Sequence, residues 1–169
     1  MKQNELPEPW LRGTLAEVPA VPRAVLHALE LAKEDIGRWC GRLNDEQLNA
    51  RPWGIAPIAF HLRHIARSAD RLLTYAEGGQ IAGEQIGALK SELDAGAKRG
   101  ELFAELYAAF DRSAARIRAL DTSKLDEPRT VGRQQLPTTV AGLLVHVADH
   151  TQRHVGQVVT TAKIVSAQE

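Results

Sequence analysis

The sequence predicts an all-α protein, a four-helix bundle with a long crossover between its second and third helices. Alanine and leucine are abundant, whereas only 5% of the residues are aromatic, and this composition favours helices. Apolar residues recur at three- and four-residue steps in four segments, and strand-forming residues do not cluster in alternating patterns. The length of 169 residues suits one domain with a substantial buried core.

The first 20 residues and the first helix differ sharply in composition. Residues 1–20 hold three prolines and a glycine, which predict an irregular N-terminal arm with Trp10 and Leu11 as its anchors on the body. We expect residues 21–165 to form the single helical domain. Its first helix follows Pro22, a residue that suits a helix start, and extends to about residue 43.

The second helix and the crossover come next. Pro52 and Gly54 interrupt the apolar pattern, and the second helix covers about residues 57–77, before Gly78 and Gly79. Residues 79–98 form a long connection with one weak helical turn. Even half extended, it spans about 30 Å. It can therefore return the chain to its starting end and make the second and third helices parallel.

The third and fourth helices complete the predicted domain. The third helix covers about residues 100–120, and residues 121–137 form another connection. The last helix starts beside Thr138 or Thr139, either of which can act as its N-cap, and continues to about residue 164.

Charge and cysteine content exclude several classes of protein. Lys and Arg total 21, as do Asp and Glu, so the net charge of zero predicts no nucleic-acid partner and no anionic membrane surface. The single cysteine, Cys40, cannot form an internal disulfide. The N-terminus lacks the apolar region of a signal peptide, and no apolar run is long enough to span a membrane. We therefore expect a cytoplasmic protein without membrane contacts.

The histidines of the last helix predict a metal or catalytic site. His146, His150 and His154 follow one another at four-residue steps. At about 100° per residue, His150 and His154 lie on the inward stripe of this helix and His146 lies at its edge. Such a pair can offer two nitrogens to one ion. As two ordinary core residues they would need hydrogen bonds for four ring nitrogens, which is the less favoured alternative.

A third ligand is expected from the second helix, where the residues alone leave two candidates. His61 and His64 both lie on this helix, and its apolar stripe mildly favours His61 as the inward residue. Either side chain can reach the seam between the second and last helices. Metal sites in helical bundles use ligands from facing helices in this way.

Three segments carry a resemblance to a known family. The sequences "LNARPWGIAPIAFHLRH", "HIARSAD" and "HTQRHVGQ" resemble the DinB/YfiT-like family of metal-dependent enzymes, whose pattern extends over roughly residues 20–163. The resemblance implies a four-helix bundle with a long middle crossover. It also implies a divalent metal held by three histidines, which correspond to His64, His150 and His154. Relatives often have an acidic residue where this chain has Arg67, so no carboxylate role carries over there.

The predicted function follows from the expected ligand set. Three neutral histidines leave a coordination position open, as in catalytic zinc sites. We expect a metal-dependent enzyme that acts on a small molecule, with zinc as the default metal and nickel or iron as alternatives. Its reaction is hydrolysis or transfer of a low-molecular-weight thiol, since some relatives use such thiols.

Other roles stay open on the sequence alone. No residue clearly supplies a general base, and Gln157 either orients a ligand or makes an interhelical hydrogen bond. The second hypothesis is a non-catalytic metal-binding bundle that acts as a sensor, a store or a structural site. A homodimer is compatible with an exposed bundle face, but no residue indicates one.

Overall fold

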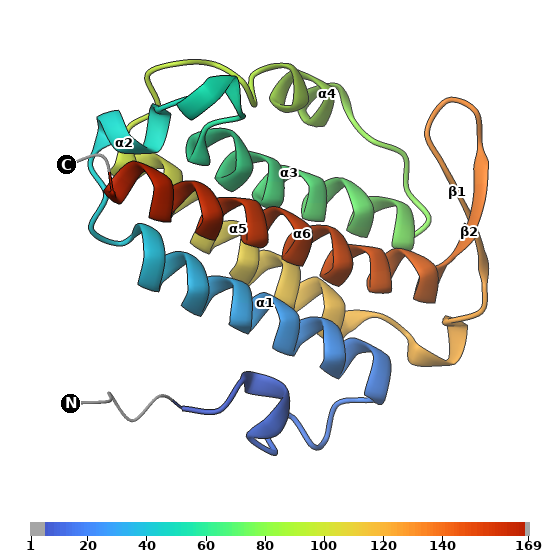
Figure 1. The fold of residues 1–169 in the computed structure, drawn as a ribbon. Helices are drawn as coiled ribbons and strands as arrows, with labels where there is room; N and C mark the ends of the chain where they lie inside the picture. The colour runs from blue at the N-terminus through green and yellow to red at the C-terminus, as the bar shows by residue number, and fades with distance from the viewer. Residues whose placement is uncertain (1–5, 168–169) are drawn as a thin grey trace.

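Four long helices run side by side in the computed structural model, which describes residues 6–167 (Figure 1). These helices are α1 (Ala20–Cys40), α3 (Ile58–Ala76), α5 (Arg99–Ala119) and α6 (Val140–Ser166). The packing is cyclic, because α6 contacts α1 and α3, while α5 contacts α3 and α1. In Figure 1, α3 and α5 run in the same direction, opposite to α1 and α6. The fold is mostly helical, and the crossover returns the chain to its starting end as predicted.

The shorter elements connect these helices. The helix α2 (Asp45–Asn49) and a 3-10 turn (Pro52–Gly54) join α1 to α3, and α4 (Gly83–Lys90) lies within the crossover. Other 3-10 turns cover Pro9–Leu11 and Thr122–Lys124. Two short strands, β1 (Pro128–Val131) and β2 (Leu136–Thr139), precede α6.

The hairpin corrects the prediction of an exclusively helical chain. The strands β1 and β2 pair in antiparallel register, with Pro128 opposite Thr139 and Val131 opposite Leu136. The turn between them includes Gly132 and Gln135, both at positive φ. Each strand has only four residues and no buried position, so it presents no alternation of apolar and polar residues in the sequence.

The ends of two helices show where local sequence signals succeed. Thr139 caps α6 through its hydroxyl, which accepts a 3.1 Å hydrogen bond from the backbone N–H of Gly142. This confirms one of the two predicted N-caps. The first helix begins at Ala20, slightly before the predicted start, and Pro22 lies in its first turn, where a proline removes no intrahelical hydrogen bond.

The N-terminal arm is held by charge and not by its two large apolar residues. Trp10 and Leu11 are 61% and 56% exposed, so the prediction that they anchor the arm is wrong. Instead, the Arg12 guanidinium donates to Glu34 at 2.6 and 2.9 Å and to Glu30 at 3.2 Å, both on α1. Nearby, Leu15 and Val18 pack against the core.

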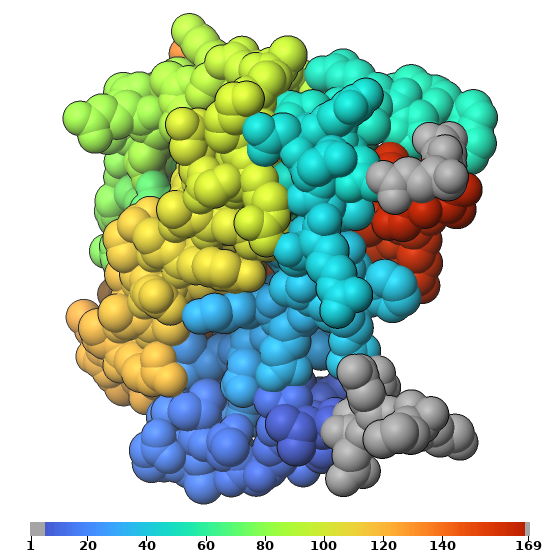
Figure 2. Space-filling model, turned by 90° about the vertical axis from the view of Figure 1, so that its left-hand side faces the viewer, coloured from blue at the N-terminus to red at the C-terminus, as the bar shows by residue number. Residues whose placement is uncertain are grey.

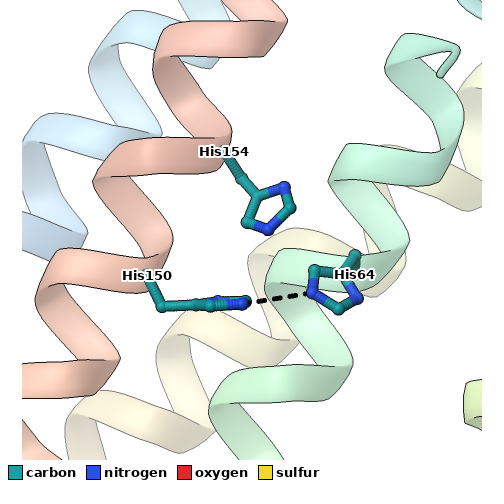
Figure 3. Close-up of side chains that lie close together, drawn as sticks. All are labelled: His64, His150 and His154. Carbon is teal, nitrogen blue, oxygen red and sulfur yellow. Dashed lines mark hydrogen bonds between the residues drawn. The ribbon is translucent and has the colours of Figure 1, made fainter. Parts of the chain in front are cut away.

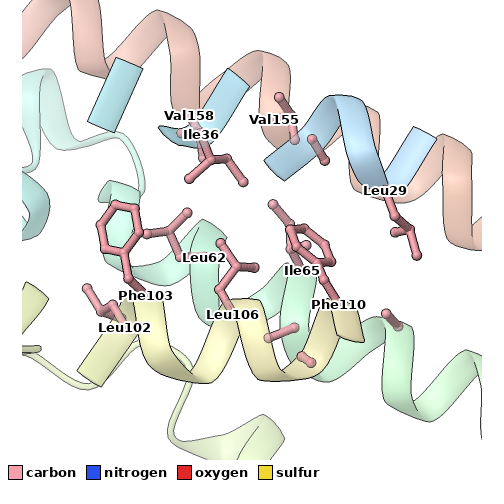
Figure 4. Packing of buried hydrophobic residues seen from close by; sticks show 14 of the residues in the cluster. Leu29, Ile36, Leu62, Ile65, Leu102, Phe103, Leu106, Phe110, Val155 and Val158 are labelled. Carbon is pink, nitrogen blue, oxygen red and sulfur yellow. The ribbon is translucent and has the colours of Figure 1, made fainter. Parts of the chain in front are cut away.

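The core lies between the four long helices, as Figure 4 shows. Each helix contributes fully or almost fully buried aliphatic residues, among them Ile36, Leu62, Ile65, Leu106, Val155 and Val158. Burial of one such side chain contributes about 1.5–3 kcal/mol. The apolar stripe of α6 therefore fixes which of its faces meets α3.

The crossover lies along α3 and is fastened to it by three arginines one turn apart. Arg63 donates to the carbonyl of Asp94 at 2.7 Å, and Arg67 donates to the carbonyl of Ala88 at 2.7 Å. Arg71 donates to the carboxylate of Glu92 at 2.9 Å. Positions four apart share one helix face, so this arginine stripe holds the second half of the crossover, around residues 88–94, against α3.

The far end of the crossover meets the segment around α2. Figure 2 shows these two parts (yellow-green and cyan) against each other at one end of the molecule. The side-chain amide of Asn49 donates to the carbonyl of Ala97 at 2.9 Å and accepts from its N–H at 3.1 Å. Within residues 6–167, no helix has the length and apolar character needed to cross a membrane.

Candidate metal centre

Histidines from two helices meet where α3 packs against α6. His64 on α3 faces His150 and His154 on α6, and Figure 3 shows the three rings turned toward one another. One ring nitrogen from each of the three lies within 4.8 Å of the others. The Nε2 atoms of His64 and His150 are 3.2 Å apart. The family resemblance implied this trio as ligands, and the structure brings its members together.

Each of these rings is held from outside through its Nδ1 atom. His64 Nδ1 donates to Glu92 Oε2 at 2.6 Å, and His150 Nδ1 lies 3.3 Å from the Ser68 hydroxyl. His154 Nδ1 lies 2.9 Å from Nδ1 of His61. The Nε2 atoms are therefore the ones left for an ion, an arrangement that fixes both ring orientation and tautomer in metal sites.

The donor set fits a small divalent ion. Zinc binds imidazole nitrogen at about 2.0–2.1 Å, so two nitrogens on one tetrahedral ion lie about 3.3 Å apart. The 3.2 Å separation of His64 and His150 matches this value. The ring of Phe60 stacks on His64 with centroids 5.3 Å apart, which further limits rotation of this imidazole.

The surroundings of His150 and His154 keep these two imidazoles neutral. Burial lowers the pKa of His150 to about 4, with the neighbouring His154 and His64 adding to the effect. Burial likewise lowers the pKa of His154 to about 4, with His64 and Arg153 contributing to the effect. Neutral imidazole is the form that binds metal, so these histidines need not lose protons near neutral pH to do so.

Glu92 is a buried carboxylate that sequence reasoning missed. It is 3% exposed and accepts from His64 and from Arg71 Nη1. Burial raises the pKa of this carboxyl, but the hydrogen bonds from His64 and Arg71 outweigh it and hold the pKa below its ordinary value. Glu92 follows α4 in a connection without apolar periodicity, so no sequence pattern marked it.

The two candidates on α3 take different places. His64 belongs to the cluster of three, whereas His61, which the apolar stripe favoured, lies behind His154 and is 3% exposed. Ser68 was also missed, although its position one turn after His64 places it on the same face of α3.

His146 lies at the edge of the cluster, as the helical wheel predicted. Its Nδ1 is 3.6 Å from Asp149, which is also paired with Arg153. Asp149 is therefore engaged on the outer side of α6 and not in the cluster.

Comparison with known proteins identifies the family to which this chain belongs. The sequence profile of the DinB superfamily matches residues 28–158. The chain belongs to the DinB superfamily. DinB proteins are a metal-binding family, in agreement with the three adjacent histidines.

A solved structure supports the same fold for this DinB protein. A conserved protein from Enterococcus faecalis superposes with a TM-score of 0.73 over 89% of this chain and 99% of that one. The two sequences are 15% identical, so the likeness concerns the fold alone. A search of curated proteins gave no match.

Proposed function

We propose that this DinB protein is a metal-dependent enzyme that acts on a small molecule. Its ligands are His64, His150 and His154 on a four-helix-bundle scaffold, and zinc is the default ion. The observation that carries the proposal is the convergence of three imidazoles whose Nδ1 atoms all have outer partners. A chance group of core histidines has no reason to share this orientation.

The protein side of the chemistry follows from the charges around the rings. His64, His150 and His154 would hold a divalent ion with an open position, and the ion would lower the pKa of a water or thiol bound there. Glu92 orients His64 and leaves its Nε2 lone pair directed into the cluster. Ser68 and His61 do the same for His150 and His154. These roles serve a hydrolase and a thiol S-transferase equally.

Metal content tests the ligand set. Protein purified without chelator should contain about one divalent ion per chain, and added metal should raise the melting temperature. The double variant H150A/H154A should lose the ion. His146→Ala is the matched control, because His146 is on the same helix one turn away and should leave the ion in place. Full metal content in the double variant would refute the assignment.

Turnover assays separate the two reaction types. Metallated protein should be incubated with low-molecular-weight thiols plus electrophiles, and separately with panels of esters and amides. Thiol-dependent turnover selects the transferase, and thiol-independent cleavage selects the hydrolase. A stoichiometric ion without either activity assigns the protein to the non-catalytic metal-binding alternative.

A further inference from the structure

A pocket of about 360 Å³ lies directly beside the histidine cluster. Its walls come from the segment before α3, with Ile55 and Ala56, and from the second half of α6, with Arg153, Gly156 and Gln157. His61 also lines it, and this residue contacts the candidate ligand His154. The pocket is therefore one side chain away from the proposed ion.

His61 presents a polar atom to this pocket. Its Nδ1 faces His154, while its Nε2 has no hydrogen-bond partner in the described part of the chain. Among residues 6–167, every fully buried side-chain nitrogen or oxygen has a hydrogen-bond partner. Because Nε2 of His61 has no such partner, this atom must retain some access to solvent. A side chain that is 3% exposed thus directs its one unpaired nitrogen outward.

An ion bound to His154 would determine the tautomer of His61, and so whether its Nε2 donates or accepts a hydrogen bond in the pocket. When Nε2 of His154 binds the ion, the proton of this neutral ring is on Nδ1. That N–H donates to Nδ1 of His61, which must then accept and carry its own proton on Nε2. The pocket consequently receives an N–H donor from His61.

The remaining wall is also rich in donors and contains no acid. Arg153 uses Nε and Nη2 to bind Asp149, which leaves its Nη1 without a partner among the described residues. The exposed side chain of Gln157 makes no hydrogen bond within residues 6–167, so the interhelical side-chain bond considered from the sequence is not present there. Ile55 and Ala56 add apolar surface. Such a wall suits an anionic oxygen attached to a short apolar group.

We propose that this pocket binds the carboxylate of a small, partly apolar substrate, with His61 Nε2–H and Arg153 as donors. The inference rests on the proposed function, because the ion on His154 sets the tautomer of His61. His61 is here a substrate-binding residue and not a metal ligand.

Gly156 provides a clean test of the pocket. A Cβ atom added at Gly156 meets no atom within 4 Å, and Gly156 lines the pocket, so Gly156→Leu should fill the pocket without disturbing the fold. Gly100 on α5 has equally open surroundings for a Cβ atom and does not line the pocket, so Gly100→Leu is the matched control. Hexanoate is the probe, and hexan-1-ol is its uncharged counterpart.

Binding should be followed by NMR titration of zinc-loaded protein, with metal content measured in parallel. Hexanoate should bind wild type and Gly100→Leu, and Gly156→Leu should bind it at least about tenfold more weakly with its zinc retained. Arg153→Met should weaken hexanoate by a similar factor but leave hexan-1-ol unchanged. The ¹⁵N spectrum of His61 should show a protonated Nε2 and an unprotonated Nδ1.

The outcomes distinguish this inference from the metal proposal. Equal hexanoate binding in wild type and Gly156→Leu, with zinc present in both, overturns the pocket and leaves the metal site standing. A His61 ring protonated on Nδ1 in the zinc-loaded protein overturns its role as donor. Hexanoate binding at the pocket in a protein that takes up no metal overturns the metal site instead.

Discussion

At the scale of single residues, the carboxylate of Glu92 affects how strongly His64 can bind a metal ion. It lies 2.6 Å from Nδ1 of His64 and shares its other oxygen with Arg71. A charged acceptor at this place makes the imidazole a stronger ligand, because it stabilises the N–H as the ring gives electron density to the ion.

Glu92→Gln should therefore lower metal affinity by about 10- to 100-fold, since the amide can still accept the hydrogen bond but has no charge. Competition with a chelator of known affinity measures the change. Glu84→Gln, on the exposed face of α4, is the control and should bind metal as wild type does. Equal affinities in the two variants would show that Glu92 has only a packing role.

The same scale shows what sequence reasoning can and cannot identify in the site. His150 and His154 could be predicted because four-residue spacing alone places two side chains on one helix face. The choice between His61 and His64 could not be made from apolar periodicity, because both residues contact the cluster, one directly and one through His154. Glu92 depends on tertiary folding of a connection 28 residues away from His64, and no local pattern encodes that.

At the scale of elements, the start of α6 depends on one capping hydrogen bond, from the N–H of Gly142 to the hydroxyl of Thr139. Thr139 ends β2 and caps α6, so one hydroxyl defines the junction between the hairpin and the helix that carries two proposed ligands.

Thr139→Ala should lower the free energy of unfolding by about 1 kcal/mol, because the N–H of Gly142 loses its acceptor. Urea denaturation measures this change. Thr139→Ser keeps the hydroxyl and should stay close to wild type. If Thr139→Ser lowered the free energy of unfolding as much as Thr139→Ala does, the effect would belong to packing of the threonine methyl group and not to the cap.

The helices and strands differ in how predictable they are, because the sequence pattern that marks each one extends over a different length of chain. The long helices were predictable, since three or more turns of apolar residues repeat in each one. The hairpin was not, because four-residue strands with exposed or half-buried side chains depend on a turn and not on burial. Trp10 and Leu11 failed as anchors because Arg12 already holds the arm on α1 through two carboxylates.

At the scale of the whole molecule, three histidines link stability to pH. Burial lowers the pKa of His61 to about 4, with His154 and His64 contributing, and the pKa values of His150 and His154 are also about 4. In the unfolded chain these groups titrate at about 6.5. Between those values only the unfolded state binds the protons, so stability decreases as pH falls through this window.

We expect the urea midpoint of metal-free protein to fall progressively from about pH 6.5 to pH 4 and to change less between pH 7 and 8. The variant H150Q/H154Q should show a flatter profile, since two of the groups are gone. A wild-type midpoint that stays constant down to pH 4.5 would contradict the buried, neutral state of these rings.

The attachment of the crossover has a kinetic consequence. Among residues 77–98 only Glu92 and Ala97 are buried, so this segment is held by the arginine stripe of α3 and by few apolar contacts. Segments of this kind open at a small fraction of the free energy of global unfolding. The amides of α4 should accordingly exchange with solvent deuterium well before those of α3 and α6. Each opening that separates Glu92 from His64 would weaken the proposed site, so the residence time of an ion bound there should be set by this local fluctuation and not by the stability of the core.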